Sequence, residues 1–196
     1  MFNPDSYFNK RLLDLTSSIY LNTYKRVDWN EVINNLPSEG VEVTTDPTRW
    51  KLDTPGYTEI YKMWQDANFN SASIKWTNYY PDKHFSKTII DDIASYLRIN
   101  KVHRSWISRV DPGYFAPLHW DVDDNEDEYL KSGEIFRYSI LLGEPTHGHI
   151  FIIGDDYIFE APKGSIFKWK NYKDWHSGIN AGMKPKFMLH LLGSRT

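Results

Sequence analysis

The segment EIFRYSILLGEPTHGHIFIIGDDYIFEAPKGSIFKWK, residues 134–170, predicts the architecture of this chain. It alternates short runs of β-branched and aromatic residues with turn sequences such as GEPTHG, GDD and PKG. Runs of this kind, bounded by Gly, Pro and Asp, are typical of short strands joined by tight turns. Outward from the segment, SWISRV (105–110) and KFMLHLL (186–192) repeat the pattern. We therefore expect residues 101–196 to form a sandwich of the double-stranded β-helix (jelly-roll) kind.

The first hundred residues differ, and we expect residues 1–100 to be mainly helical and to pack on that core within one compact domain. In DWNEVINNL (28–36), Asp28 followed by Glu31 has the pattern of a capping box at a helix start. Helical spacing of apolar residues predicts an earlier helix through Phe8, Leu12, Leu15 and Ile19. Further predictions are helices at 58–69 and 87–99 and a strand at 72–80. The expected fold class is α+β.

Composition limits what the chain can do. Its 196 residues are 40% hydrophobic and 16% aromatic, which is typical of a folded domain. A formal net charge of −3 lacks the basic surplus of nucleic-acid-binding proteins, so we expect no nucleic acid partner. The sequence contains no cysteine, which excludes disulfides and cysteine-ligated zinc. It shows neither a signal-peptide pattern nor an apolar run of about 18 residues, so we expect a cytoplasmic protein without a membrane span.

A candidate metal site begins in APLHWDVDD (116–124), where His119 and Asp121 stand two residues apart. Side chains at i and i+2 of an extended chain share a face, so both could reach one ion. Such a pair also arises by chance, and His176 in KDWHSGIN is the best candidate for the third ligand that a site needs. Two histidines and one carboxylate form the facial triad of non-haem Fe(II) oxygenases, which leaves positions open for a co-substrate and O₂.

A second histidine pair, His147 and His149 in PTHGHIF, is an alternative candidate for a metal site. A cupin-like metal site would need a glutamate a few residues later, and Glu160 is too distant along the chain. We therefore interpret this pair as part of a hairpin loop.

Lys186 follows His176 by ten residues and begins the last predicted strand. Alternation along that strand puts Lys186, Met188 and His190 on one face, opposite Phe187, Leu189 and Leu191. A lysine on the inward face of a small barrel is unfavourable unless it is paired. An anionic co-substrate such as 2-oxoglutarate would pair it.

These motifs resemble the Fe(II)/2-oxoglutarate dioxygenases, and among them the aspartyl/asparaginyl β-hydroxylase branch. The resemblance runs from about Ser105 to Gly193, a little under half of the chain. In SRVDPGYFAPLH, Ser108 precedes a Pro-Gly turn, and His119 stands eleven residues after the serine. FRYSILLG contributes Arg137 and Ser139, and HSGINAGMKPK contributes His176 and Lys186.

The resemblance implies that Fe(II) is bound by His119, Asp121 and His176. It also implies that 2-oxoglutarate is held at its distal carboxylate by Lys186, with help from Arg137, Ser108 and Ser139. The implied reaction hydroxylates an unactivated C–H bond of an amino acid, a protein side chain or a similar small substrate, and releases succinate and CO₂. Two positions depart from the branch: Lys186 stands where Arg is usual, and Ser139 stands where His is frequent.

Two other functions stay open at this point. The chain could be a jelly-roll or cupin-like metal-binding module whose chemistry has been altered or lost, or a metalloenzyme that works without 2-oxoglutarate. Dependence of turnover on 2-oxoglutarate separates these possibilities. The acidic run DVDDNEDEYLKSGE (121–134) is either a solvated loop or a lid that selects cationic or otherwise polar substrates.

Overall fold

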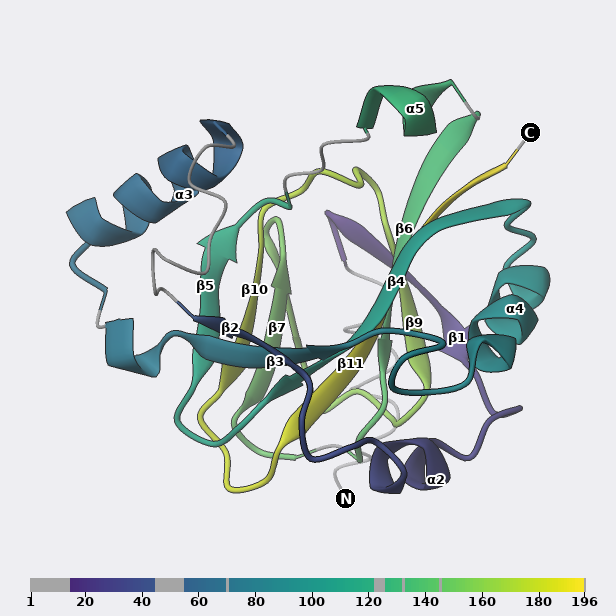
Figure 1. Cartoon of the computed structure of the whole chain (residues 1–196), viewed down its shortest axis with the longest axis horizontal. Helices are drawn as coiled ribbons and strands as arrows, with labels where there is room; N and C mark the ends of the chain where they lie inside the picture. The colour runs from purple at the N-terminus through teal and green to yellow at the C-terminus, as the bar shows by residue number, and fades with distance from the viewer. Residues whose placement is uncertain are drawn as a thin grey trace, which may run out of the picture.

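Two antiparallel sheets make up most of the computed structural model, which describes residues 15–44, 55–69, 71–121, 126–131, 133–144 and 146–195 (Figure 1). Within these residues the larger sheet has seven strands in the order β1-β9-β6-β11-β4-β3-β2. Their bounds are Ser18–Thr23 (β1), Ser165–Trp169 (β9), Glu134–Leu141 (β6), Lys186–Arg195 (β11), Lys101–Val110 (β4), Lys75–Tyr79 (β3) and Val41–Thr44 (β2). The smaller sheet, in the same residues, has the order β5-β10-β7-β8, with bounds Phe115–His119, His176–Asn180, His149–Ile153 and Asp156–Phe159.

The hydrophobic core lies in two layers because the larger sheet is covered on both faces. One layer lies between the sheets and joins Phe151 and Ile153 of β7 to Phe167, Trp169 and Met188 of the larger sheet. The second layer lies on the other face of the larger sheet, where helix α4 (Lys87–Tyr96) contributes buried residues. Its members include Tyr138, Ile140, Leu189, Leu191, Ile90 and Ile93. The double-stranded β-helix core predicted for the second half is therefore present.

Strand β11 follows the predicted alternation and sets the position of Lys186. It pairs with β4 on one side and β6 on the other, so it is internal to the larger sheet. Met188 packs between the sheets, whereas Leu189 and Leu191 pack in the second layer. Lys186 and His190 alternate with the same period as Met188, so they lie on its face of the strand, and both are buried. The inward face of this strand therefore carries two polar side chains.

The prediction of a mainly helical N-terminal part is not supported. The described residues before position 101 contain β1, β2 and β3, which extend the larger sheet at its two ends (Figure 1). The helix predicted from Phe8 to Ile19 is wrong where the structure describes it, because residues 18–23 form strand β1, paired with β9. Residues 1–14 lie outside the described part of the chain.

A buried carboxylate explains why this segment is extended. Asp156, at the start of β8, accepts hydrogen bonds from the backbone N–H groups of Thr16, Ser17 and Ser18 at 2.7–2.9 Å. It also accepts hydrogen bonds from the Thr16 and Ser18 hydroxyls, at 3.0 and 2.7 Å. These contacts and the pairing with β9 outweigh the weak helical preference of the local sequence.

The other local predictions for the first half are confirmed. Helix α2 (Trp29–Asn34) begins after Asp28, whose side chain accepts hydrogen bonds from the N–H groups of Asn30 and Glu31. The helices predicted at 58–69 and 87–99 correspond to α3 (Pro55–Asp66) and α4, and the strand predicted at 72–80 corresponds to β3. Two shorter helical segments are η1 (Ser71–Ser73) and α5 (Glu126–Leu130). None of the helices in the described ranges has the length and apolar character needed to cross a membrane.

We predict that Asp156→Ala lowers the free energy of unfolding by about 2–4 kcal/mol, because it removes a buried acceptor and leaves several donors without a partner. The matched control is Asp155→Ala, which truncates the exposed neighbouring carboxylate and should change stability by less than about 0.5 kcal/mol. Urea denaturation followed by tryptophan fluorescence measures both variants. Equal loss of stability in the two would show that Asp156 does not hold β1 in place.

Candidate metal centre

His119 and His176 meet across two neighbouring strands of the smaller sheet. His119 ends β5, His176 begins β10, and the two residues are direct partners in the antiparallel register. Their ring centroids are 4.2 Å apart. The next partners are Ala116 and Gly178, so β5 carries one extra residue between the two pairs. This β-bulge, at the site of Pro117, turns His119 to the same face as His176.

Asp121 completes the group just beyond the end of β5. Its Oδ1 lies 3.8 Å from Nε2 of His119 and 3.8 Å from Nε2 of His176. One potential ligand atom from each of the three side chains lies within 4.8 Å of the others, and no other such group of three occurs in the described residues. The structure thus brings together the three side chains that the sequence singled out.

Backbone contacts orient both imidazoles toward this point. Nδ1–H of His119 donates to the Pro117 carbonyl at 2.6 Å, and Nδ1–H of His176 donates to the Asp174 carbonyl at 3.2 Å. Each ring therefore presents an unprotonated Nε2 to Asp121. Burial lowers the pKa of His119, and burial together with the neighbouring His119 and Arg137 lowers the pKa of His176 well below its ordinary value. Neutral imidazole is the form that binds a metal.

Arg137 of β6 holds the second oxygen of Asp121. Its Nη2 is ion-paired with Oδ2 of Asp121 and lies 3.4 Å from Nε2 of His176. Its guanidinium carbon lies 3.8 Å from the ring centroid of Trp169. Burial raises the pKa of Asp121, but Arg137 and then the two histidines outweigh burial, so the pKa lies below its ordinary value. Asp121 is therefore ionised, with Oδ1 directed to the histidines and Oδ2 to Arg137.

Aromatic rings surround the histidines on the remaining sides. Trp64 of α3 and Trp76 of β3 each lie 6.0 Å from the His119 ring, measured between centroids. Trp64 also donates its indole N–H to the Leu118 carbonyl at 3.0 Å, next to His119. On the other side, the Trp169 ring lies 4.9 Å from the ring of His176. Sequence reasoning missed Trp64 and Trp76, since nothing local ties α3 or β3 to His119.

Lys186 lies deeper between the sheets. Its ammonium group donates to the Ile150 carbonyl of β7, and a Cβ built on Gly178 would lie 3.8 Å from Nζ. Gly178 stands two residues after His176, which is about 7 Å along the strand. Among the described residues no carboxylate pairs with Lys186, and burial lowers its pKa to about 7. The structure thus places the buried ammonium group of Lys186 close to the candidate metal centre.

Ser108 and Ser139, predicted as helpers, both contact His190. The Ser108 hydroxyl lies 3.1 Å from Nε2 of His190 and the Ser139 hydroxyl lies 3.1 Å from Nδ1. Burial lowers the pKa of His190 to about 3, so its ring is neutral. Trp169 also donates its indole N–H to the Ser139 hydroxyl at 3.0 Å. His190 is therefore a fully hydrogen-bonded core residue, and any direct role of the serines toward a co-substrate stays a prediction.

His147 and His149 lie away from this centre. His147 is 96% exposed at its side chain and pairs with Glu160, 2.5 Å away, although the two are distant along the chain. His149 donates from Nε2 to the Lys184 carbonyl at 2.8 Å. The two histidines therefore have different partners, and they do not converge on one point with a third ligand in the described residues.

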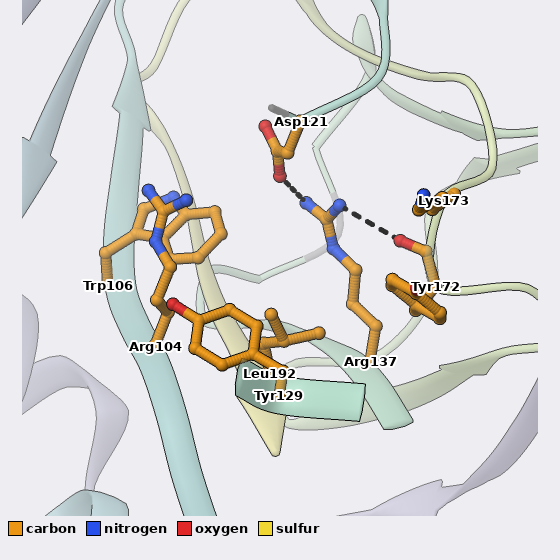
Figure 2. Close-up of a pocket in the computed structure, with 8 residues that line it drawn as sticks. All are labelled: Arg104, Trp106, Asp121, Tyr129, Arg137, Tyr172, Lys173 and Leu192. Carbon is orange, nitrogen blue, oxygen red and sulfur yellow. Dashed lines mark hydrogen bonds and ion pairs between the residues drawn. The ribbon is translucent and has the colours of Figure 1, made fainter. Parts of the chain in front are cut away.

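A pocket opens beside Asp121, and Lys186 is not among its described lining residues. Its volume is about 30 Å³, well below the range of about 300–1,000 Å³ that is usual for small-molecule sites. Figure 2 shows Arg104 and Arg137 on opposite walls, with Asp121 between them at one end and Tyr129 and Leu192 below. Sequence reasoning did not find this pocket, because its walls come from β4, α5, β6 and β11.

Comparison with solved structures identifies the class of fold. A 2OG-Fe(II) oxygenase family oxidoreductase from Burkholderia pseudomallei matches over 100% of this chain and 93% of its own, with 14% identity and a TM-score of 0.56. The viral collagen prolyl hydroxylase of Paramecium bursaria Chlorella virus-1, in complex with 2-oxoglutarate, matches over 93% of this chain and 98% of its own. The identity is 17% and the TM-score is 0.52. The chain has the fold of the 2OG-Fe(II) oxygenases. These likenesses do not confirm the narrower aspartyl/asparaginyl β-hydroxylase branch. No protein-family model matches the sequence, and no curated protein does.

We predict that His176→Ala weakens Fe(II) binding at least about a hundredfold, because loss of a ligand exceeds the tenfold to hundredfold effect of losing an outer partner. His147→Ala is the matched control, since it removes an exposed imidazole away from the centre. Isothermal titration with Fe(II) under nitrogen measures both. Unchanged affinity in His176→Ala would remove His176 from the ligand set.

Proposed function

We propose that this chain is an Fe(II)- and 2-oxoglutarate-dependent dioxygenase that hydroxylates an unactivated C–H bond of an amino acid, a peptide or protein side chain, or a similar small substrate. The observation that carries the proposal is the arrangement of three potential metal ligands and one lysine at the inner face of the smaller sheet. Two neutral histidine nitrogens and one carboxylate oxygen converge on one point, and a buried lysine stands two residues further along β10. The fold, shared with 2OG-Fe(II) oxygenases, supports the same conclusion.

The donor set suits Fe(II). Two imidazole nitrogens and one carboxylate occupy one face of an octahedron and leave the other positions open. Asp121 offers a single oxygen to that face because Arg137 holds the other one. When bound, Fe(II) with 2-oxoglutarate and O₂ supplies the oxidising power for hydroxylation, with succinate and CO₂ as products.

Lys186 gives the co-substrate its orientation. A five-carbon dicarboxylate that chelates a metal with its 2-keto acid end extends its other carboxylate by about the two-residue step between His176 and Gly178. Gly178 has no side chain, so the space beside Nζ of Lys186 stays open to that carboxylate. A charge-assisted hydrogen bond there replaces the weaker contact with a neutral carbonyl. Trp64, Trp76 and Trp169 limit the access of water to the histidines.

Lys186 also weighs against the alternative functions. A metal-binding module or a metalloenzyme without 2-oxoglutarate needs the three ligands but has no use for a buried cation beside them. Such a cation is unfavourable without an anionic partner. The same residue therefore supplies the test that separates the proposed function from its alternatives.

The deciding experiment adds Fe(II) and then 2-oxoglutarate to the protein under nitrogen and records the weak visible charge-transfer band of the chelate. We expect the band in the wild type, and in Lys186→Met we expect an apparent Kd for 2-oxoglutarate that is raised roughly tenfold to hundredfold. Lys184→Met, which removes an exposed ammonium two residues earlier, is the matched control and keeps the wild-type Kd. A wild type that binds iron and never shows the band would contradict the dioxygenase assignment.

The same titration has a characteristic pH dependence. With its pKa near 7, Lys186 is charged in the free protein below pH 7 and mostly neutral above it. The Kd for 2-oxoglutarate should therefore be constant near pH 6 and rise above pH 7, by at most about tenfold per pH unit. Lys186→Arg, whose guanidinium stays protonated, should remove this rise. An equal pH dependence in the wild type and Lys186→Arg would assign the titration to another group.

We further predict that Gly178→Ala lowers the affinity for 2-oxoglutarate but not for Fe(II). The added methyl group meets Nζ of Lys186 at 3.8 Å and Cγ2 of Val110 at 3.9 Å, which are ordinary contacts that the fold tolerates. It occupies the space that the distal carboxylate needs. The charge-transfer band reports the co-substrate and isothermal titration reports the metal. Unchanged affinity for both would place the co-substrate elsewhere.

A further inference from the structure

A row of polar side chains crosses the inner face of the larger sheet. Trp169 of β9 donates its indole N–H to the Ser139 hydroxyl of β6 at 3.0 Å. The Ser139 hydroxyl lies 3.1 Å from Nδ1 of His190 on β11, and Nε2 of His190 lies 3.1 Å from the Ser108 hydroxyl on β4. The four strands are neighbours in the order β9-β6-β11-β4. The four side chains therefore form one continuous hydrogen-bonded row.

The hydrogen-bonding capacity of each group gives this row a direction. An indole N–H can only donate, so the Ser139 oxygen accepts from Trp169. Burial lowers the pKa of His190 to about 3, so the ring is neutral, and one of its nitrogens donates while the other accepts. The hydroxyl hydrogen of Ser139 finds its acceptor in Nδ1. His190 then carries its proton on Nε2 and donates to Ser108.

The opposite direction leaves a buried donor without a partner. If Nδ1 of His190 carried the proton, Ser139 would accept from both Trp169 and His190, and its own hydrogen would have no acceptor. Ser139 is fully buried, and Trp169 and His190 are the partners of its hydroxyl among the described residues. A buried donor without a partner is unfavourable by about 1–3 kcal/mol. The direction from Trp169 to Ser108 is therefore favoured.

Ser108 ends the row with a hydroxyl hydrogen that is still available. Its oxygen accepts from the imidazole, and it has no other hydrogen-bond partner among the described residues. Ser108 is paired in register with Met188, which packs between the sheets, and it is partly exposed. Two residues further along β4, Val110 borders the same open space beside Gly178 as Nζ of Lys186. The hydroxyl of Ser108 therefore faces the inter-sheet space in which the proposed function places 2-oxoglutarate.

We propose that Ser139 and His190, held by Trp169, are positioning residues that commit the Ser108 hydroxyl to donate into this space. The inference rests on the proposed function and on the expectation that Ser108 helps to hold 2-oxoglutarate. In the opposite direction Ser108 would donate to Nε2 of His190 and present only lone pairs to the co-substrate. A carboxylate accepts hydrogen bonds and is repelled by lone pairs. The direction of the row thus decides whether this wall attracts an anion.

The first test locates the proton on the His190 ring in the metal-free protein. Nitrogen NMR of histidine-labelled protein, with the His190 signals assigned from His190→Gln, shows which ring nitrogen is protonated. We expect the proton on Nε2 in the wild type. In Ser139→Ala neither form pairs Nδ1, so the two forms become comparable in free energy and we expect a mixture of them. A proton on Nδ1 in the wild type would overturn the inference.

The second test asks whether the row acts on 2-oxoglutarate through Ser108. Titration of the Fe(II)-loaded protein under nitrogen, followed by the charge-transfer band, gives the apparent Kd. We expect Ser139→Ala to raise it about twofold to fivefold, because only part of the molecules keep Ser108 as a free donor. In a Ser108→Ala background the same substitution should have no further effect. Ser165→Ala, at a buried serine of β9 outside the row, is the matched control and keeps the wild-type Kd and the proton on Nε2.

Two results of the second test would also overturn the inference. One is an unchanged Kd in Ser139→Ala, which would show that the direction of the row does not matter for the co-substrate. The other is an equal rise of the Kd with and without the Ser108 hydroxyl, which would assign the effect of Ser139 to general packing. A wild type that binds iron and never shows the band would instead contradict the proposed function, while a proton on Nε2 would still establish the direction of the row.

Discussion

The ion pair between Asp121 and Arg137 is the interaction on which both parts of the site depend. Arg137 is 4% exposed and packed against Trp169, so it needs a counter-charge in the folded state. Removing one partner of such a buried pair typically costs about 3–5 kcal/mol, because it leaves the other charge unpaired. The pair fixes Asp121 with one oxygen toward the histidines and the other toward Arg137. The candidate metal centre and the pocket therefore both depend on this one ion pair.

Much of this arrangement could be predicted from local sequence, because it depends on periodicity within strands. Alternation along 186–192 placed Lys186 and His190 on the inward face, and the structure agrees. The i, i+2 spacing of His119 and Asp121 suffices to bring their side chains together at a strand end. His176 could be matched to them because the motifs resemble those of the dioxygenases, and the structure places it opposite His119.

The rest could not be predicted, because it depends on contacts between distant segments. Strand β1 is extended because it pairs with β9 and because Asp156, 138 residues after Ser18, accepts the N–H groups of Ser18 and of the two residues before it. The bulge at Pro117 is visible only once β5 is paired with β10, and without it His119 would point to the other face. Trp64 and the walls of the pocket come from elements whose packing the sequence does not encode in any short motif.

Buried cations destabilise the fold of the ligand-free protein, and bound anions would reduce this destabilisation. The pKa of Lys186 is about 7 in the folded chain, against about 10.4 in an unfolded one, so the unfolded state binds more protons between these pH values. Stability of the ligand-free protein therefore rises with pH across this range, which means that holding the charge on Lys186 opposes folding. An anion beside Nζ reverses the effect, because it favours the protonated amine and binds only the folded state. The same reasoning applies to Arg137, which cannot discharge and has Asp121 as its one described counter-charge. A buried cation that weakens the ligand-free fold is thus a group that an anion would stabilise.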